Sequence, residues 1–386
     1  MSPETVLDLR SAPRTRTSSR LACTKQVLAW TALLLACACG ASAPTPFQRS
    51  RDAAESQYSK GRFADSAARW LQAAREATTA RDRNEARYRA ATSYERAGDL
   101  AHAEQLYTSL AAGKSERAPR ATFALADLQI RKGDEAGGNA ALEAAVRKYP
   151  SSGVANLALR RYFAVLAERG GDQAVLEYIA QVEPALGATD LKEQLLYERA
   201  RRLEATGRAS TARDAYLELA DRFPYPHGAY WDDALFRGAD LELRLGQPER
   251  AIALLERMLR ARESSHLSGS YERPRFAEAA YHLAELYRDT RHDPDGARRA
   301  FRGVFEGYAT STLRDDALWQ EALLSRSPAA SAACAPLTLL VSQLPDSRYA
   351  PCAHVICAKL ATFAGRECPA YIQQQISTGP KPESAE

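Results

Sequence analysis

Residues 85–111 read EARYRAATSYERAGDLAHAEQLYTSLA, and this stretch decides the fold. Before the Gly98-Asp99 turn, Ala91 and Tyr94 lie three residues apart, on one face of a helix. After the turn, Ala103, Tyr107 and Leu110 keep helical spacing. The stretch therefore predicts two short helices joined by a tight turn.

Similar turns return along the chain at a nearly fixed interval. Glycines mark six of them, with spacings of 37, 35, 37, 37 and 39 residues: Gly61, Gly98, Gly133, Gly170, Gly207 and Gly246. In a seventh unit, His292-Asp293-Pro294 replaces the glycine turn. A single helix pair is too small to bury its own apolar face, so this period indicates stacked pairs that stabilise one another.

The order small, aromatic, glycine, alanine, aromatic resembles the tetratricopeptide repeat. Later units keep the register, for example through Ala200, Gly207, Ala212 and Tyr216, whereas the first, third and fourth units are degenerate at Ser66, Gly138 and Val175. The resemblance covers about residues 51–325. It implies an all-α fold, a right-handed α-solenoid of seven to eight helix pairs, and a protein that binds proteins or peptides.

The junctions between repeats carry a narrower resemblance. Residues 223–235 (FPYPHGAYWDDAL), 308–319 (YATSTLRDDALW) and 344–350 (LPDSRYA) resemble the YPxSxYADDAL junction of BamD-like and Tol-Pal-associated envelope repeat proteins. Proline ends one helix, and the aspartates fall in the first turn of the next, where the helix dipole favours negative charge. This resemblance implies a role in the cell envelope.

The N-terminus predicts a lipid anchor. Residues 27–36 (VLAWTALLLA) form an apolar run of ten that is too short to cross a bilayer, and Arg20 and Lys25 precede it. Leu34-Leu35-Ala36-Cys37 resembles the lipobox of bacterial lipoproteins, which implies cleavage before Cys37 and its acylation. Cys39 is the runner-up, because the upstream leucine is missing, and an ordinary cleaved signal is the alternative. The expected location is the periplasmic face of the outer membrane.

The chain is predicted to contain five segments. These are a signal peptide (1–36), a flexible tether (37–50), the solenoid (51–325), a C-terminal cysteine-containing helical cap (326–376) and a disordered tail (377–386). Residues 260–274 lengthen one junction and are polar, so we expect a protruding loop there, either a tolerated insertion or a partner contact.

The charge balance gives no reason to expect nucleic acid as a partner. The formal net charge is +4, and residues 1–36 hold five basic and two acidic side chains, so the rest of the chain carries +1. Binding to a phosphate backbone calls for a concentrated basic face.

Six aromatic residues occupy one equivalent position, the fifth of the first helix in each pair. They are Tyr88, Phe123, Tyr197, Phe236, Tyr281 and Trp319. In tetratricopeptide proteins that position borders the concave groove, so these residues are candidates for a row that grips a peptide. The alternative is that they pack on the preceding repeat, and Trp319 and Phe236 fit that alternative better than the others.

Four cysteines lie in one late segment: Cys334, Cys352, Cys357 and Cys368. In an oxidising compartment an even number of clustered cysteines suggests two disulfides. Three pairings are possible, although Cys352 and Cys357 lie five residues apart on an expected helix, which makes that bridge awkward. Buried free thiols and a zinc site with His354 are the alternatives.

No catalytic motif is present. Gly113-Lys114-Ser115 ends like a phosphate-binding loop, but Thr108 stands where its first glycine is needed. The sequence contains no His-Glu-x-x-His and no Gly-x-Ser-x-Gly. We therefore expect no enzyme, no cofactor, no metal and no small-molecule substrate.

The predicted function is a lipid-anchored periplasmic scaffold that holds protein partners in outer-membrane assembly or maintenance. Two alternatives stay open. One is a pilotin-like lipoprotein for a secretion or pilus system, and the other is a regulator of a peptidoglycan enzyme.

Overall fold

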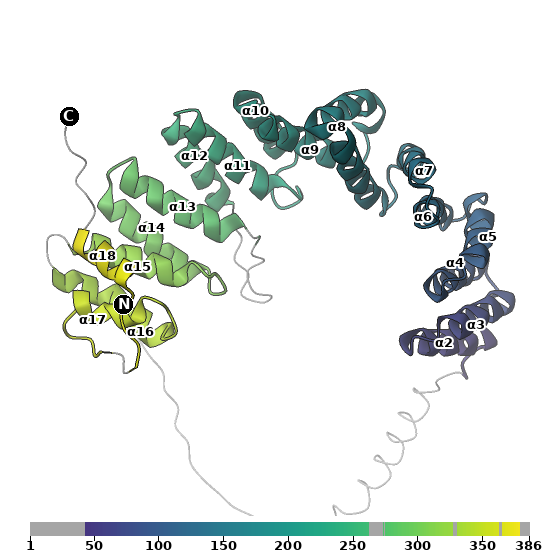
Figure 1. Ribbon diagram of the computed structural model, residues 1–386, viewed down its shortest axis with the longest axis horizontal. Coiled ribbons are helices and arrows are strands. Elements are labelled where there is room, and N and C mark those ends of the chain that lie inside the picture. The colour runs from purple at the N-terminus through teal and green to yellow at the C-terminus, as the bar shows by residue number, and fades with distance from the viewer. Residues whose placement is uncertain (1–42, 262–272, 274, 327–329, 363–364, 379–386) are drawn as a thin grey trace, which may run out of the picture. The chain divides into compact units, whose positions relative to one another are not determined.

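The computed structural model describes residues 43–261, 273, 275–326, 330–362 and 365–378. The chain divides after Arg117 into two compact units, here called unit 1 and unit 2. Within the described residues every regular element is helical (Figure 1). The prediction of an all-α fold built from consecutive helix pairs is confirmed.

Unit 1 contains two helix pairs. Their helices are α2 (Pro46–Ser59), α3 (Phe63–Glu76), α4 (Ala80–Ala97) and α5 (Leu100–Ala111). Each helix packs against the next along the chain. Most buried side chains between α2, α3 and α4 are alanines; Trp70 is the one ring among them, and Phe47 packs against this small core.

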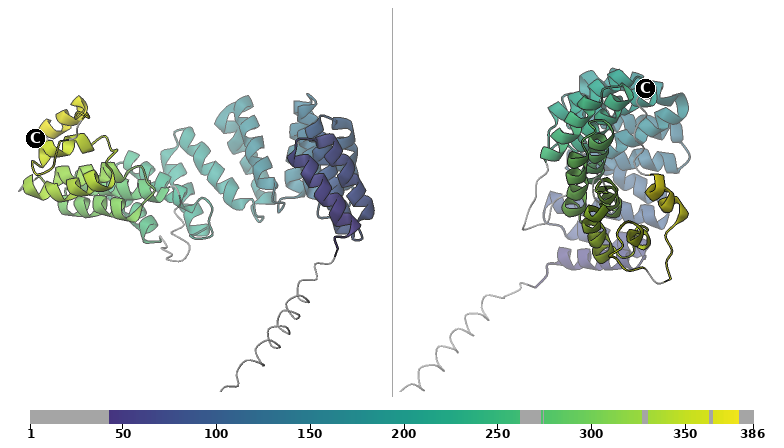
Figure 2. Two further views of the ribbon diagram at one scale, coloured as in Figure 1. Left: turned by 90° about the horizontal axis from the view of Figure 1, so that it is seen from below. Right: turned by 90° about the vertical axis from the view of Figure 1, so that its left-hand side faces the viewer.

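Unit 2 contains the remaining pairs. Its first helices are α6 (Ala118–Arg131), α7 (Glu135–Lys148), α8 (Ala155–Leu186), α9 (Lys192–Ala205), α10 (Ala209–Arg222), α11 (Trp231–Arg244) and α12 (Pro248–Arg260). They are followed by α13 (Arg275–Asp289), α14 (Pro294–Gly307), α15 (Arg314–Leu324) and α16 (Cys334–Gln343). Consecutive helices again lie side by side, as two further views show (Figure 2).

The predicted turns owe their shape to a left-handed residue. Gly98 ends α4 at φ +83°, and the amide of Asp99 reaches back to the Tyr94 carbonyl. Five further glycines at the repeat turns also have a positive φ: Gly61, Gly133, Gly171, Gly207 and Gly246. A side chain is disfavoured there because its Cβ crowds the backbone. His292 takes the same position in the seventh unit at φ +50°.

The fourth turn lies one residue later than the spacing suggested. Gly171, not Gly170, has the positive φ, and it sits inside α8 as a non-helical residue at φ 70° and ψ −173°. Helix α8 is thus two helices that meet at a kink. It forms the fourth pair, so the helices from α2 to α16 make eight pairs in the described residues.

The tether and the tail are shorter than predicted. Helix α2 begins at Pro46, inside the expected tether, because Thr45 and Gln48 cap it reciprocally and proline suits the first helical position. At the other end, α18 (Ala370–Thr378) extends two residues into the expected tail. The signal peptide, most of the 260–274 loop and the rest of the tail lie outside the described residues.

The C-terminal cap completes unit 2. After α16 come a 3₁₀ turn (Ala350–Cys352), the short α17 (Ala353–Ile356) and α18. Ile372 and Ile376 of α18 pack into a core that also holds Trp319 of α15 and Leu337 of α16. The cap therefore buries the apolar face of the last pair, which has no further repeat to cover it.

Candidate functional site

Tyr197, Phe236 and Tyr281 lie on the first helices of three consecutive pairs, and each is partly exposed. We call the surface formed by α9, α11 and α13 around these rings the first-helix face. Their positions are equivalent because the repeat is regular. They leave part of each ring accessible while the rest packs on the core of unit 2.

Phe123 and Trp319 do not contribute to such a face. Phe123 is 4% exposed and Trp319 is fully buried. The Trp319 ring stacks on Tyr349, with ring centroids 4.8 Å apart. The predicted row of six groove-lining aromatics is therefore wrong for these two residues, which pack inside unit 2. Tyr88 belongs to unit 1, where its ring lies 5.7 Å from Tyr107.

The Asp233 carboxylate links three repeats on the first-helix face. Its Oδ2 atom accepts hydrogen bonds from the Tyr197 hydroxyl at 2.5 Å and from Arg237 Nε at 2.7 Å. Arg275 Nε donates to its Oδ1 atom, also at 2.7 Å. Burial opposes ionisation, yet these three donors hold the pKa of Asp233 below its ordinary value. The group is an anion that joins α9, α11 and α13.

The other junction aspartates also accept hydrogen bonds from residues of the following junction. Asp232 accepts from Arg273 at 3.1 Å, and Asp315 accepts from the Ser347 hydroxyl at 2.8 Å. Asp316 accepts from the Tyr349 hydroxyl at 2.6 Å and also from Arg348. The aspartates do lie in the first turn of α11 and α15, as predicted. Their links to the following repeat were not predicted, because the donors are distant in sequence.

Glu204 forms a second anionic centre at the end of α9. Its carboxylate accepts from Arg244 at 2.6 Å, from the Tyr216 hydroxyl at 3.0 Å and from Arg237 at 3.3 Å. Arg237 therefore serves both Asp233 and Glu204. These cations and anions neutralise one another within the fold.

Asp240 and Glu285 are less completely paired. His282 Nε2 lies 3.7 Å from Asp240 Oδ1, and His282 Nδ1 lies 3.4 Å from Glu285 Oε2. Burial raises the pKa of the Asp240 carboxyl, and the neighbouring charges only partly oppose it. The contact with Glu285 raises the pKa of His282 against the effect of burial. The Nε2 atom is buried and has no hydrogen-bond partner.

A cleft of about 430 Å³ lies between α8, α9 and α10. Its floor is apolar and includes Leu176 and Leu203. Arg199 spans it, contacting Glu183 at 3.4 Å and Glu218 at 2.8 Å. Arg199 of α9 thus bridges α8 and α10 through these two carboxylates.

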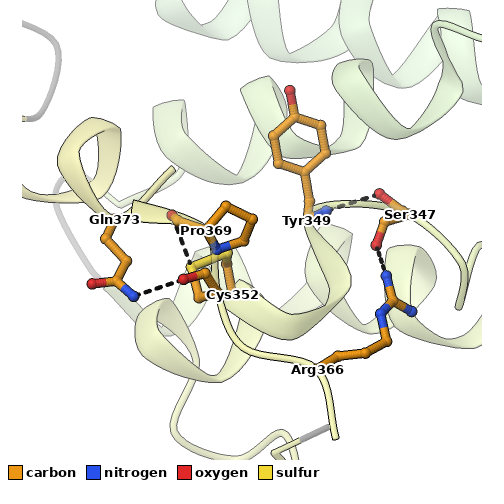
Figure 3. The surroundings of a disulfide bond; sticks show 7 residues. Ser347, Tyr349, Cys352, Arg366, Pro369 and Gln373 are labelled. Atoms are coloured by element: carbon orange, nitrogen blue, oxygen red, sulfur yellow. Dashed lines mark hydrogen bonds between the residues drawn. A yellow bond between two sulfur atoms is a disulfide. The ribbon is translucent and has the colours of Figure 1, made fainter. Parts of the chain in front are cut away.

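The four late cysteines form two disulfides, as predicted. Cys334 pairs with Cys357 and Cys352 pairs with Cys368, with Cα–Cα distances of 5.2 and 4.7 Å. Nearby, Arg366 donates to the Ser347 carbonyl at 2.7 Å and Gln373 donates to the Cys368 carbonyl at 2.7 Å (Figure 3). The bridges and these bonds hold the non-helical parts of the cap. Cys37 and Cys39 lie outside the described residues.

Two further properties follow from the described part of the chain. No group of three or more His, Cys, Asp or Glu side chains there is arranged to hold a metal ion. Nor is any helix in it long and apolar enough to span a membrane.

The sequence matches the family model "Tetratricopeptide repeat" at residues 120–152 and 233–262. The first match covers most of α6 and α7, and the second covers most of α11 and α12. The fold defines the class, a protein of stacked helix pairs. The helix pairs in these two segments are similar to tetratricopeptide repeats. No curated protein matches the sequence significantly.

Solved structures of repeat proteins resemble the chain only loosely. One is the C-terminal part of a TPR repeat-containing protein from Cytophaga hutchinsonii, with 12% identity, a TM-score of 0.44 and coverage of 69% of this chain and 98% of that one. Another is a tetratricopeptide repeat protein from Parabacteroides merdae, with 13% identity, a TM-score of 0.33 and coverage of 72% and 98%. Neither likeness bears on what this chain binds.

Proposed function

We propose that this chain is a scaffold that binds protein partners through its first-helix face. The observation that carries the proposal is the set of three partly exposed rings, Tyr197, Phe236 and Tyr281, at equivalent positions of consecutive repeats. Large, rigid aromatic side chains bury much area at little entropic cost when a partner covers them. Regular spacing suits a partner that runs along several repeats.

We further propose that the scaffold is lipid-anchored at Cys37 and works on the periplasmic face of the outer membrane. The lipobox-like Leu34-Leu35-Ala36-Cys37 supports the anchor, and the two disulfides suit an oxidising compartment. The junction sequences, which resemble those of BamD-like and Tol-Pal-associated proteins, support a role in outer-membrane assembly or maintenance. Substitution Cys37→Ser tests the anchor, because the variant should leave the membrane fraction and lose a lipid label. A Cys39→Ser variant should keep both.

The binding face can be tested by photo-crosslinking in cells. A photoreactive phenylalanine analogue at Phe236 or Tyr281 should capture a defined envelope protein. The same analogue at Tyr371 serves as the control, because that ring is 53% exposed but lies on α18 in the cap. Capture of a β-barrel assembly component supports the assembly role. Capture of a pilus or secretion subunit, or of a peptidoglycan enzyme, would instead establish one of the two alternatives. Equal labelling from all three positions would contradict the binding face.

A further inference from the structure

The cleft between α8, α9 and α10 corresponds to a space that is filled in the next repeat. That space lies between α10, α11 and α12. A Cβ atom on Gly238 of α11 would lie 3.5 Å from a δ carbon of Leu217 and 3.6 Å from a δ carbon of Leu254. Two leucines, one from α10 and one from α12, thus pack against Gly238.

In the cleft, alanines stand at both leucine positions. Val175, Ala212 and Ala251 occupy the same buried position of α8, α10 and α12. Ala180 follows this position by five residues, as the leucine of α10 does, and Ala215 follows it by three, as the leucine of α12 does. Both alanines line the cleft. The smaller side chains explain why about 430 Å³ stays open here.

Arg199 takes the place of Gly238 in this repeat. It follows Tyr197 by two positions, as the glycine follows Phe236. Its guanidinium group contacts carboxylates of both α8 and α10, so its charge is balanced within the fold. Two positions along a helix differ by roughly 200°, so Arg199 and Tyr197 point to different sides of α9. The cleft is therefore separate from the Tyr197 ring of the first-helix face.

The lining beside the two alanines is apolar. Leu176 and Leu203 line the cleft where the next repeat has Arg213 and Glu242, whose side chains lie 3.4 Å apart. Ile179 is a further apolar residue of the lining. Covering such a surface with an apolar side chain is favourable, because it removes apolar area from water. The cleft therefore suits an aliphatic side chain.

One exposed cation of the lining has no acidic partner. Arg208 contacts the neutral side-chain amide of Gln173 at 2.8 Å and pairs with no carboxylate of the described residues. The acids of the lining, Glu183, Asp214 and Glu218, are each paired with an arginine. Arg208 therefore remains available to pair with an acidic group of an occupant.

We propose that this cleft is a second docking site, which takes a leucine side chain from an acidic segment of a protein partner. The leucine would fill the space that Leu217 and Leu254 fill in the next repeat. A neighbouring aspartate or glutamate of the partner would pair with Arg208. This site goes beyond the proposed function, because it does not depend on what the first-helix face binds.

The test uses the full chain and three fluorescein-labelled peptides, (Ser-Ala-Leu-Glu)₃, (Ser-Ala-Ser-Glu)₃ and (Ser-Ala-Leu-Lys)₃. Fluorescence anisotropy gives their affinities. The leucine–glutamate peptide should bind at least about tenfold more tightly than the serine–glutamate peptide, because only the former can bury leucine side chains. It should also bind about threefold more tightly than the leucine–lysine peptide, whose charge Arg208 repels.

Filling the cleft from within should compete with the partner. Ala180→Leu should lower the affinity for the leucine–glutamate peptide about tenfold. Ala253→Leu is the matched control, because it adds the same side chain at an exposed alanine of α12 that does not line the cleft. It should leave the affinity within about twofold of the wild type. Circular dichroism checks that both variants stay folded.

A second pair of variants tests the charge at exposed positions, where the fold is not at stake. Arg208→Gln should remove the preference for the glutamate peptide over the lysine peptide. Arg250→Gln removes an exposed arginine of α12 outside the cleft and should keep that preference.

Equal affinities for the leucine–glutamate and serine–glutamate peptides would overturn the inference. So would equal effects of Ala180→Leu and Ala253→Leu, or an absence of binding by the leucine–glutamate peptide. Light scattering detects the other occupant, a second copy of this chain: self-association of the wild type that Ala180→Leu abolishes would also contradict an acidic partner. The proposed function is judged separately, by whether Phe236 and Tyr281 crosslink partners that Tyr371 does not.

Discussion

The Asp233 carboxylate joins the first helices of three consecutive repeats. It receives donors from α9, α11 and α13 at 2.5 to 2.7 Å. Burial also raises the pKa of the Tyr197 hydroxyl, so Tyr197 remains a proton donor to Asp233 at neutral pH. The aromatic position thus has two roles. Tyr197 ties neighbouring repeats together by its hydroxyl, and it offers the remainder of its ring as surface.

Replacing Asp233 with asparagine should weaken unit 2. The change keeps the size of the side chain but leaves Arg237 and Arg275 without their shared anion, so the free energy of unfolding should fall by about 1–3 kcal/mol. Urea unfolding measures this. Asp221→Asn is the control, since Asp221 makes one exposed ion pair, with Arg257, and should cost at most about 1 kcal/mol. Equal losses in the two variants would show that the three-helix link adds nothing.

His282 should make stability depend on pH in a defined direction. Its pKa is raised in the folded state, so its contribution is complete below the unfolded value of about 6.5 and is lost as pH rises through the folded value. Relative to His282→Gln, the wild type should therefore be more stable at pH 6 than at pH 8. Thermal unfolding of both proteins at the two pH values measures the difference. A constant offset between them would contradict the link to Asp240 and Glu285.

The sequence could identify the equivalent aromatic position in each repeat, but not whether each ring is buried or partly exposed. Trp319 and Tyr281 occupy the same place in the repeat, yet Trp319 is buried in the core that the cap completes, where Tyr349 from the following junction stacks on it. That contact depends on residues 30 positions away, which a repeat alignment does not register. The sequence also does not show how Asp240 and Glu285 are paired, because their pairing depends on which carboxylates Arg237, Arg244 and Arg288 contact.

At the scale of elements, the turns set the period of the fold. A glycine with positive φ ends the first helix of most pairs, so the spacing of glycines predicted seven to eight pairs. Gly171 shows the limit of this reasoning. Gly170 and Gly171 are adjacent, and only the backbone shows which of them adopts the unusual conformation.

Gly171→Ala should destabilise unit 2, because its φ of 70° and ψ of −173° are nearly restricted to glycine. The expected loss is about 1–3 kcal/mol. Gly303→Ala is the matched control. Gly303 lies inside α14, where an added Cβ meets no atom within 4 Å, so alanine should stabilise the helix by about 0.5–1 kcal/mol. The urea midpoint should fall in Gly171→Ala and rise in Gly303→Ala. A higher midpoint in Gly171→Ala would show that the kink does not require glycine.

The structure of the C-terminal cap could be predicted only in part from the sequence. Clustering predicted disulfides, but the choice among three pairings needs distances between Cα atoms, which only the fold supplies. The helical signal is weak there too. Helix α17 has four residues, and the segment between it and α18 has no regular helix among its described residues. Covalent bonds and side chain to backbone hydrogen bonds hold this region in place of long helices.

At the scale of the whole molecule, the repeat period passes through Arg117 without a break, although the structure divides into two units there. The spacing of the repeat turns indicates how each helix pair is built. It does not indicate how strongly one pair packs on the next, since that depends on the particular side chains at each interface. A count of seven to eight pairs was therefore predictable, and the division into two units was not.

Within unit 2, a disturbance at one end should fade with distance, because each repeat packs mainly on its neighbours. Reduction of both disulfides should raise amide hydrogen exchange most in α16 to α18 and less in α15. Helices α9 to α11 should keep their protection. Mass-spectrometric exchange with and without dithiothreitol measures this, and Cys352→Ser/Cys368→Ser should reproduce part of the effect. Uniform loss of protection across unit 2 would instead mean that it unfolds as one cooperative block.

The two disulfides interleave along the sequence: one joins Cys334 to Cys357, and the other joins Cys352 to Cys368. Every peptide bond between Cys334 and Cys368 is therefore enclosed by at least one of the two loops. A protease that nicks this segment once cannot release a fragment, since both halves remain covalently connected. In a compartment rich in proteases and without ATP-driven repair, that connectivity would let the end of the molecule survive a cut that detaches an ordinary terminal segment.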